Sequence, residues 1–201
     1  MFTSRSIQST LTFRDKIFSI DYILVFSILT LGVISMFAMY STDGGSFAYH
    51  TRSHILRFFV FFSLFIIISF FPIKFWFQSS LIIYFVFFLL LVGVKYFGLT
   101  SSGSQRWINL YVINLQPSEL MKIGLILFLA KYYHRIPVSD VNKFRFLFFP
   151  IICVTAPALL VISQPDLGTA ILIVAGGIIV AWLAGIKFKF FAYISIIFLA
   201  L

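Results

Sequence analysis

The sequence predicts an all-α fold: a polytopic transmembrane helix bundle with about seven spans and a cytoplasmic N-terminus. Hydrophobic residues make up 61% of the 201 residues, charged residues only 10%, and the mean hydropathy is +1.08. Soluble domains carry about 25% charged residues, and a single soluble core could not bury so much apolar surface. The sequence has one cysteine, so a disulfide framework within the chain is excluded.

Each predicted span is an apolar stretch close to the roughly 20 residues that a helix needs to cross the hydrocarbon core. Inside lipid every backbone polar group needs an internal partner, and an α-helix supplies one. Residues 1–20 form a polar cytoplasmic segment, and the absence of a convincing cleavage site predicts an uncleaved first helix. The predicted spans are residues 22–40, 55–71, 80–97, 118–133, 144–163 and 167–184, with a seventh beginning at residue 188.

The placement of lysine and arginine predicts the orientation, because cytoplasmic loops carry an excess of both. With the N-terminus inside, ten basic residues fall in cytoplasmic segments and five fall outside. The inside set is Arg5, Arg14, Lys16, Lys74, Lys131, Arg135, Lys143, Arg145, Lys187 and Lys189. The outside set is Arg52, Arg57, Lys95, Arg106 and Lys122. The net charge of +9 therefore requires no nucleic-acid partner, because anionic membrane lipids attract the cytoplasmic turns.

The sequence stops at Leu201, about 14 residues into an apolar run that begins at Phe188. A helix ending there would fall short of the far side of the bilayer. We therefore expect a single membrane domain over residues 1–201 that is truncated at its C-terminal end. The sequence contains no repeat of fixed period and no low-complexity linker that would divide this domain.

The first polar region of interest is the loop of residues 98–116, which is extracytoplasmic in this orientation. Polar residues near the membrane are candidate functional residues because burying them is expensive. Arg106 and Trp107 are adjacent in this loop. They fit an aromatic-belt anchor with an arginine facing lipid phosphate, and they fit a specific grip on a lipid head group equally well.

The second polar region, residues 116–122, has the signature of a helix start. Pro117 suits the first helical position, and Glu119 falls in the first turn, where the helix dipole favours a negative charge. Lys122 follows three residues later and shares a face with Glu119. The pair is either a local ion pair at a helix start or part of a functional site.

The third polar region, residues 164–170, repeats the order glutamine, proline and acid, the acid here being Asp166. Both motifs open helices that enter from the outer face, so we expect Glu119 and Asp166 at similar depth. These two carboxylates, Lys122 and Arg106 could line one outward-facing polar cavity. Alternatively, Asp166 stabilises only the N-terminus of its own helix.

Other special residues favour structural roles. His50 and His54 are four residues apart but lack a third ligand, so a metal site is not expected there. Pro150 and Pro157 are expected to kink the fifth span. The glycines at 176–177 permit close packing of helices.

Three motifs in order resemble the SEDS family (shape, elongation, division and sporulation proteins). They are Ser-Gln-Arg-Trp-Ile at 104–108, Gln-Pro-Ser-Glu-Leu-Met-Lys at 116–122 and Gln-Pro-Asp-Leu-Gly-Thr at 164–169. The resemblance covers the whole chain in order, and the last two motifs are long and specific. Within the family the chain is most similar to the RodA branch (rod-shape determination), with the FtsW branch (division) second.

The resemblance implies an activity. Family members have about ten transmembrane helices and polymerise the undecaprenyl-linked precursor lipid II at the outer face of the bacterial cytoplasmic (inner) membrane. They work with a class B penicillin-binding protein, a transpeptidase, and in the RodA branch with the elongation machinery. The catalytic base of the family is thought to be an acid in a loop after the seventh helix, beyond Leu201. We therefore assign no catalytic residue within this chain.

The residues that carry over as members of the family's polar cavity are Arg106, Trp107, Glu119, Lys122 and Asp166. No cofactor is certain, although Glu119 and Asp166 could help to hold a divalent cation. Three functions stay open at this point. They are lipid II polymerisation, flipping of lipid-linked precursors between leaflets, and a catalytically inactive remnant that binds a partner.

Overall fold

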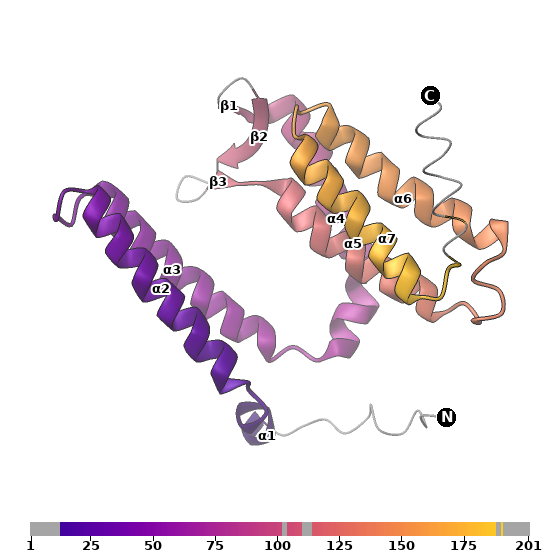
Figure 1. Ribbon diagram of the computed structural model, residues 1–201, viewed down its shortest axis with the longest axis horizontal. Coiled ribbons are helices and arrows are strands. Elements are labelled where there is room, and N and C mark those ends of the chain that lie inside the picture. The colour runs from indigo at the N-terminus through magenta and orange to yellow at the C-terminus, as the bar shows by residue number, and fades with distance from the viewer. Residues whose placement is uncertain (1–12, 102–103, 110–113, 188–189, 191–201) are drawn as a thin grey trace. The chain divides into compact units, whose positions relative to one another are not determined.

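The computed structural model describes residues 13–101, 104–109, 114–187 and 190. The chain forms two compact units, Met1–Pro72 and Ile73–Leu201. The first contains helices α1 (Phe13–Phe18), α2 (Tyr22–Thr42) and α3 (Tyr49–Ser69). The second contains helices α4 (Ile73–Phe97), α5 (Pro117–His134), α6 (Phe144–Ile162) and α7 (Leu167–Leu183), shown in Figure 1. Strands β1 (Leu99–Ser101), β2 (Ser104–Asn109) and β3 (Asn114–Leu115) lie between α4 and α5 in the sequence.

In the first unit, α2 and α3 pack together along their length. The Asp21 carboxylate starts α2 by accepting from the backbone N–H groups of Ile23 and Leu24, both at 3.0 Å. Further along, Gly32 lets the two helices approach closely. A Cβ at Gly32 would lie 2.2 Å from the Phe58 ring, so any larger residue would push that ring away.

Polar side chains also join α2 to α3. The hydroxyl of Ser35 donates to the carbonyl of Gly32 at 2.7 Å. Ser35 Oγ also lies 2.9 Å from His54 Nε2 on α3, within hydrogen-bond distance. At the turn, the Asp43 carboxylate accepts from both the N–H and the hydroxyl of Thr51, at 2.8 and 2.6 Å. The α2–α3 pair is therefore held by packing and by hydrogen bonds at two levels.

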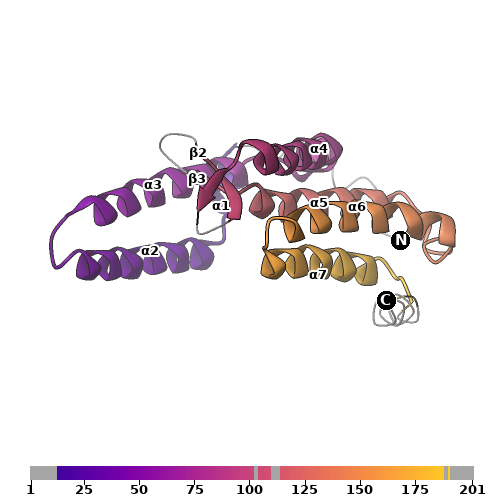
Figure 2. The ribbon, with the colours of Figure 1, turned by 90° about the horizontal axis from the view of Figure 1, so that it is seen from above.

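The second unit is a bundle in which α4 lies against α5, α5 against α7, and α7 against α6 (Figures 1 and 2). Two glycines bring these helices close together. A Cβ at Gly124 would lie 2.9 Å from Phe87 Cδ2, and one at Gly177 would lie 2.6 Å from Val154 Cγ2. The largest fully buried side chains of the bundle core are Leu91, Met121, Leu125, Leu129 and Ile173.

A small antiparallel sheet connects the end of α4 to the start of α5. Its strand order is β1-β2-β3, with Thr100 opposite Gln105 in the first pair and Asn109 opposite Asn114 in the second. The central strand, β2, carries Arg106 and Trp107. The sheet therefore holds these two residues at the end of the bundle where α5 begins (Figure 1).

The prediction of a helical membrane bundle is confirmed. Within the described residues, four helices are long and apolar enough to cross a bilayer, namely α2, α3, α4 and α6. Two further helices fall at predicted spans, but α5 contains Glu119, Lys122 and Lys131, and α7 has only 17 residues. The expected seventh span lies almost entirely outside the described residues. The sequence did not predict α1 or the sheet.

Candidate functional site

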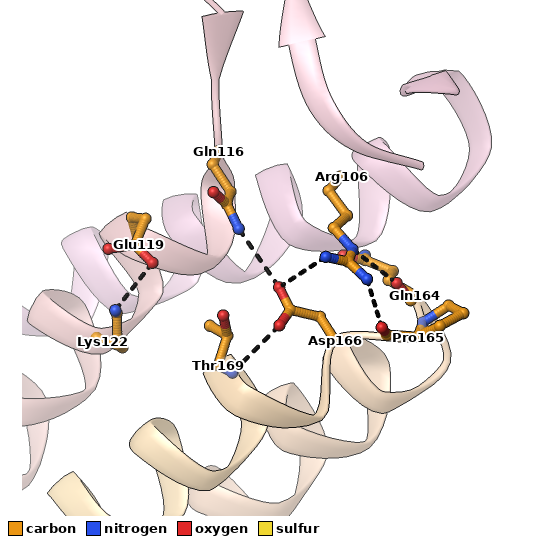
Figure 3. A network of polar contacts seen from close by, with 8 residues as sticks. All are labelled: Arg106, Gln116, Glu119, Lys122, Gln164, Pro165, Asp166 and Thr169. Carbon is orange, nitrogen blue, oxygen red and sulfur yellow. Dashed lines mark hydrogen bonds and ion pairs between the residues drawn. The ribbon is translucent and has the colours of Figure 1, made fainter. Parts of the chain in front are cut away.

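Three secondary-structure elements, β2, α5 and α7, bring polar residues together at one end of the bundle (Figure 3). Strand β2 supplies Arg106, and the residue that caps α5 is Gln116. Glu119 and Lys122 follow in the first two turns of α5, and Asp166 caps α7. The starts of α5 and α7 thus lie side by side, as the parallel glutamine-proline motifs predicted.

Arg106 binds the turn between α6 and α7. Its Nε donates to the carbonyl of Gln164 at 3.0 Å, and its Nη2 donates to the carbonyl of Pro165. Its third nitrogen, Nη1, lies 3.8 Å from the Asp166 carboxylate. The turn follows the C-terminal end of α6, where a cation is favoured by the helix dipole. All three guanidinium nitrogens are thus engaged with the protein.

Asp166 is bonded through both carboxylate oxygens. Oδ1 accepts from the backbone N–H of Thr169 at 3.2 Å, which is an N-cap of α7. Oδ2 accepts from the Gln116 side-chain amide at 3.4 Å and faces Arg106. The Asp166 side chain is only 12% exposed. Its contacts make it an organiser of two helix starts, which agrees with the helix-stabilising alternative.

Gln164 is a residue that the sequence reasoning did not include in the site. It is 4% exposed, and its amide donates to the carbonyl of Leu91 on α4 at 3.4 Å. Its own carbonyl accepts from Arg106. The signal that could have found it is a glutamine at the end of an apolar span, because a buried amide there needs partners.

Glu119 and Lys122 form a second, separate pair. Lys122 Nζ donates to Glu119 Oε1 at 2.9 Å, so the two residues form the local ion pair that was one of the two alternatives for this motif. The Glu119 side chain is 54% exposed and that of Lys122 is 23% exposed. Among the residues drawn in Figure 3, no hydrogen bond or ion pair joins this pair to the cluster around Asp166. Their role towards a substrate stays a prediction.

The structure places the other candidate residues without giving them a chemical role. Trp107 is half-buried on β2, opposite Leu99 in the strand register. His54 bonds to Ser35 within the first unit. In the part of the chain that the structure describes, no three His, Cys, Asp or Glu side chains are grouped to hold a metal ion. A divalent cation at Glu119 or Asp166 would need ligands from elsewhere, such as substrate phosphates.

A family model described as "Cell cycle protein", which takes in FtsW, RodA and SpoVE, matches residues 15–201. The chain belongs to this FtsW/RodA/SpoVE family. It is the SEDS family that the three sequence motifs indicated. Family membership and the four long apolar helices together make the chain an integral membrane protein.

Two relatives and one solved structure place the chain within the family. It is 33% identical over 143 residues to the probable peptidoglycan glycosyltransferase FtsW of Buchnera aphidicola subsp. Baizongia pistaciae, covering 71% of this chain and 38% of the relative. It is 38% identical over 98 residues to the peptidoglycan glycosyltransferase MrdB of Escherichia coli K12, covering 48% of this chain and 25% of the relative. The chain thus matches well under half of each relative's length.

The solved structure is described by the words "Structural coordination of polymerization and crosslinking by a peptidoglycan synthase complex". The match has a TM-score of 0.78 and 23% identity, and it covers 91% of this chain and 53% of the other. At this identity the likeness shows a shared fold. This chain therefore has the same helical architecture as the matched chain of that complex.

Proposed function

We propose that the chain is part of a peptidoglycan glycosyltransferase that polymerises lipid II at the outer face of the bacterial cytoplasmic membrane. The observation that carries the proposal is the partly exposed Glu119–Lys122 pair beside the cluster of Arg106, Gln116 and Asp166, whose members bind one another and the backbone. The Glu119–Lys122 pair can contact a substrate, while the cluster around Asp166 holds the starts of the helices that carry the pair. The two relatives, which are peptidoglycan glycosyltransferases by name, support this choice of reaction.

The reaction sets the requirements for the site. The acceptor hydroxyl attacks the anomeric carbon of the donor, and the bond from that carbon to the lipid diphosphate breaks. The hydroxyl proton passes to a base, and the diphosphate leaves with the bonding electrons. A cation near the leaving group lowers the barrier, because negative charge develops there.

Lys122 is the residue proposed to meet the diphosphate. An ammonium has three N–H donors, and Glu119 takes one of them in this structure. Two donors are left for phosphate oxygens, and the side chain is partly exposed. Glu119 would hold the ammonium in place.

Arg106 is proposed to act indirectly. Its three nitrogens already bind the Gln164 and Pro165 carbonyls and face the Asp166 carboxylate. We therefore assign it to holding the turn between α6 and α7, and the phosphate-binding role to Lys122. Trp107, next to it on β2, is proposed to anchor this end of the bundle at the membrane interface.

The family also supports a partner and a cellular role. A class B penicillin-binding protein would cross-link the strands, consistent with the synthase complex that shares the fold. The 38% identity to MrdB, the RodA protein of Escherichia coli, favours the elongation machinery. The longer but less identical match to FtsW keeps division as the alternative. The proposed orientation has the N-terminus in the cytoplasm and the site outside.

Binding of fluorescent lipid II to the chain in nanodiscs tests the proposed role of Lys122. We expect Lys122→Ala to weaken binding about tenfold, the equivalent of ~1.4 kcal/mol. The matched control is Lys143→Ala, because Lys143 forms the same three-residue-spaced pair with Asp140 at 2.9 Å. Equal affinities for the two variants would remove Lys122 from the proposed site.

Polymerisation of the same substrate tests the reaction, with a full-length relative as positive control. Glycan polymer formed by the chain would place a base within these 201 residues and make Glu119 the leading candidate. No polymer, beside an active control, would mean that the chain alone is no polymerase. Movement of lipid II between leaflets without polymer would support the flippase alternative.

A further inference from the structure

Helix α6 contains two prolines in its interior, Pro150 and Pro157. A proline has no N–H, so the carbonyl four residues earlier loses its helical partner. The two carbonyls affected are those of Phe146 and Cys153. In a membrane-spanning helix such a carbonyl is costly, because lipid offers it no hydrogen-bond donor.

A tyrosine from a neighbouring helix meets each of these two carbonyls. Tyr84 on α4 donates its hydroxyl to the Cys153 carbonyl at 2.9 Å. Tyr132 on α5 donates its hydroxyl to the Phe146 carbonyl at 3.2 Å. Each proline of α6 is thus paired with one tyrosine: Pro157 with Tyr84 and Pro150 with Tyr132.

Aromatic neighbours hold both tyrosine rings in position. Tyr84 is 6% exposed, with its ring centroid 4.8 Å from that of Phe128 and its plane parallel to Phe88 within 8°. The Tyr132 centroid lies 5.6 Å from that of Phe149, which is on α6 itself. The hydroxyls are therefore fixed by packing, and a rotation away from the carbonyls would disturb the core.

The Tyr84 contact lies on the same two helices as a contact of the candidate site. Leu91, seven residues after Tyr84 on α4, accepts from the Gln164 side chain just beyond the end of α6. Seven residues are about two helical turns, so Tyr84 and Leu91 share a face of α4. Helix α4 thus binds α6 at the Cys153 carbonyl, one turn before Pro157, and again at the turn that Arg106 holds.

We propose that Tyr84 and Tyr132 are positioning residues that replace the amide donors removed by Pro157 and Pro150. By tying the proline-containing helix α6 to α4 and α5, they hold the Gln164–Asp166 turn against Arg106. The hydrogen-bond replacement itself is independent of the proposed enzymatic function. Only the importance of the positioned turn rests on that function.

The test uses the fact that Cys153 is the only cysteine in the sequence. Growth with cysteine labelled at its carbonyl carbon with ¹³C therefore labels one carbonyl, the one that Tyr84 binds. Tyr84→Phe should raise the amide I frequency of this carbonyl and move its ¹³C signal upfield, because it loses a donor. Pro157→Ala restores an N–H at position 157, so the double variant should return both signals towards their original values.

The matched control combines Tyr84→Phe with alanine at the other proline, Pro150. In the Tyr84→Phe, Pro150→Ala double variant the Cys153 carbonyl should stay without a donor, because residue 150 serves Phe146 instead. Unfolding midpoints in detergent should follow the same pattern, with a loss of about 2–4 °C for Tyr84→Phe that disappears only beside Pro157→Ala. An unchanged carbonyl signal in Tyr84→Phe, or equal recovery with either alanine, would overturn the pairing.

A third signal tests whether Tyr84 positions the Gln164–Asp166 turn. The ¹⁵N–¹H resonance of Arg106 Nε should shift in Tyr84→Phe and return in the Pro157→Ala double variant. No shift would overturn the claim that the tyrosine positions the turn. None of these measurements uses lipid II, so they can fail or succeed independently of the proposed glycosyltransferase function.

Discussion

The side-chain amide of Gln116 donates to the carboxylate of Asp166 at 3.4 Å, joining the residue that caps α5 to the residue that caps α7. Fifty residues separate the two in the sequence. The N-termini of α5 and α7, which both favour negative charge, thus share the Asp166 carboxylate. The same carboxylate faces Arg106, which prevents the turn before α7 from carrying an unbalanced charge.

Replacement of Asp166 separates its capping role from its charge. Asp166→Asn keeps a side-chain oxygen that can accept from Thr169 N–H, whereas Asp166→Ala removes it. We expect Asp166→Ala to cost about 1–2 kcal/mol of stability, the usual value of an N-cap, and Asp166→Asn to cost less. Unfolding in detergent, followed by circular dichroism, measures both. Equal losses of stability in the two variants would mean that the charge of Asp166, and not its capping hydrogen bond, stabilises the protein.

Arg106→Lys should destabilise the protein although it keeps the positive charge. One ammonium cannot reach the Gln164 and Pro165 carbonyls and the Asp166 carboxylate with the geometry of a planar guanidinium. We expect a loss of about 1–2 kcal/mol, since the arginine is partly exposed. Arg135→Lys, at an exposed position, is the control and should leave the unfolding midpoint unchanged. Identical midpoints for the two variants would argue against the assigned role.

Adjacent glycines on α7 should respond differently to alanine. A Cβ at Gly177 would lie 2.6 Å from Val154 Cγ2 on α6, so Gly177→Ala should cost about 1–3 kcal/mol through overpacking. At Gly176 the nearest atom, on Ile126, is 3.8 Å away, which is ordinary contact. Gly176→Ala should therefore be neutral or mildly stabilising. The comparison of their unfolding midpoints decides whether α6 and α7 touch at Gly177.

Asp43 should titrate below the usual range for an aspartate. The hydroxyl of Thr51, and after it the Thr51 N–H, lowers the pKa of the Asp43 carboxyl by bonding its charged form. Because the folded pKa is depressed, the contact stabilises the α2–α3 turn above the unfolded pKa of about 3.9. That stabilisation is lost as the pH falls through the folded pKa.

Carboxyl ¹³C titration checks this prediction. Thr51→Val removes the hydroxyl donor and should raise the Asp43 pKa towards its ordinary value. Ser46→Ala is the control, since Ser46 donates to the Asp43 backbone carbonyl and not to its carboxylate. A titration curve that is the same in all three proteins would contradict the hydrogen-bond explanation.

The sequence located most helices but placed some of their starts too late. Helices α2, α6 and α7 begin at the predicted residues 22, 144 and 167, whereas α3 begins at Tyr49 and not at residue 55. The polar residues 49–54 are helical but would not favour the hydrocarbon. Hydropathy marks the part of a helix that suits lipid, while backbone hydrogen bonds continue into the polar interface.

The candidate site divides in the same way into local and distant contacts. The Glu119–Lys122 pair could be predicted because three residues on a helix fix the distance between side chains. The partners of Arg106 could not, since they are two backbone carbonyls in a distant turn whose chemistry is common to every residue. The tyrosine donors to α6 were missed for a similar reason, although the two prolines did mark the carbonyls that need partners.

The long separation between Arg106 and its acceptors also constrains the order of assembly during synthesis. Gln164 and Pro165 follow Arg106 by 58 and 59 residues. At a ribosomal rate of about 5–20 residues per second, the arginine is made roughly 3–12 s before them. Until α6 has entered the membrane, the guanidinium depends on water, lipid phosphate or an insertion factor for its contacts. Completion of this end of the bundle therefore follows the synthesis of Arg106 by several seconds, and a ribosome that stalls before residue 164 leaves it open.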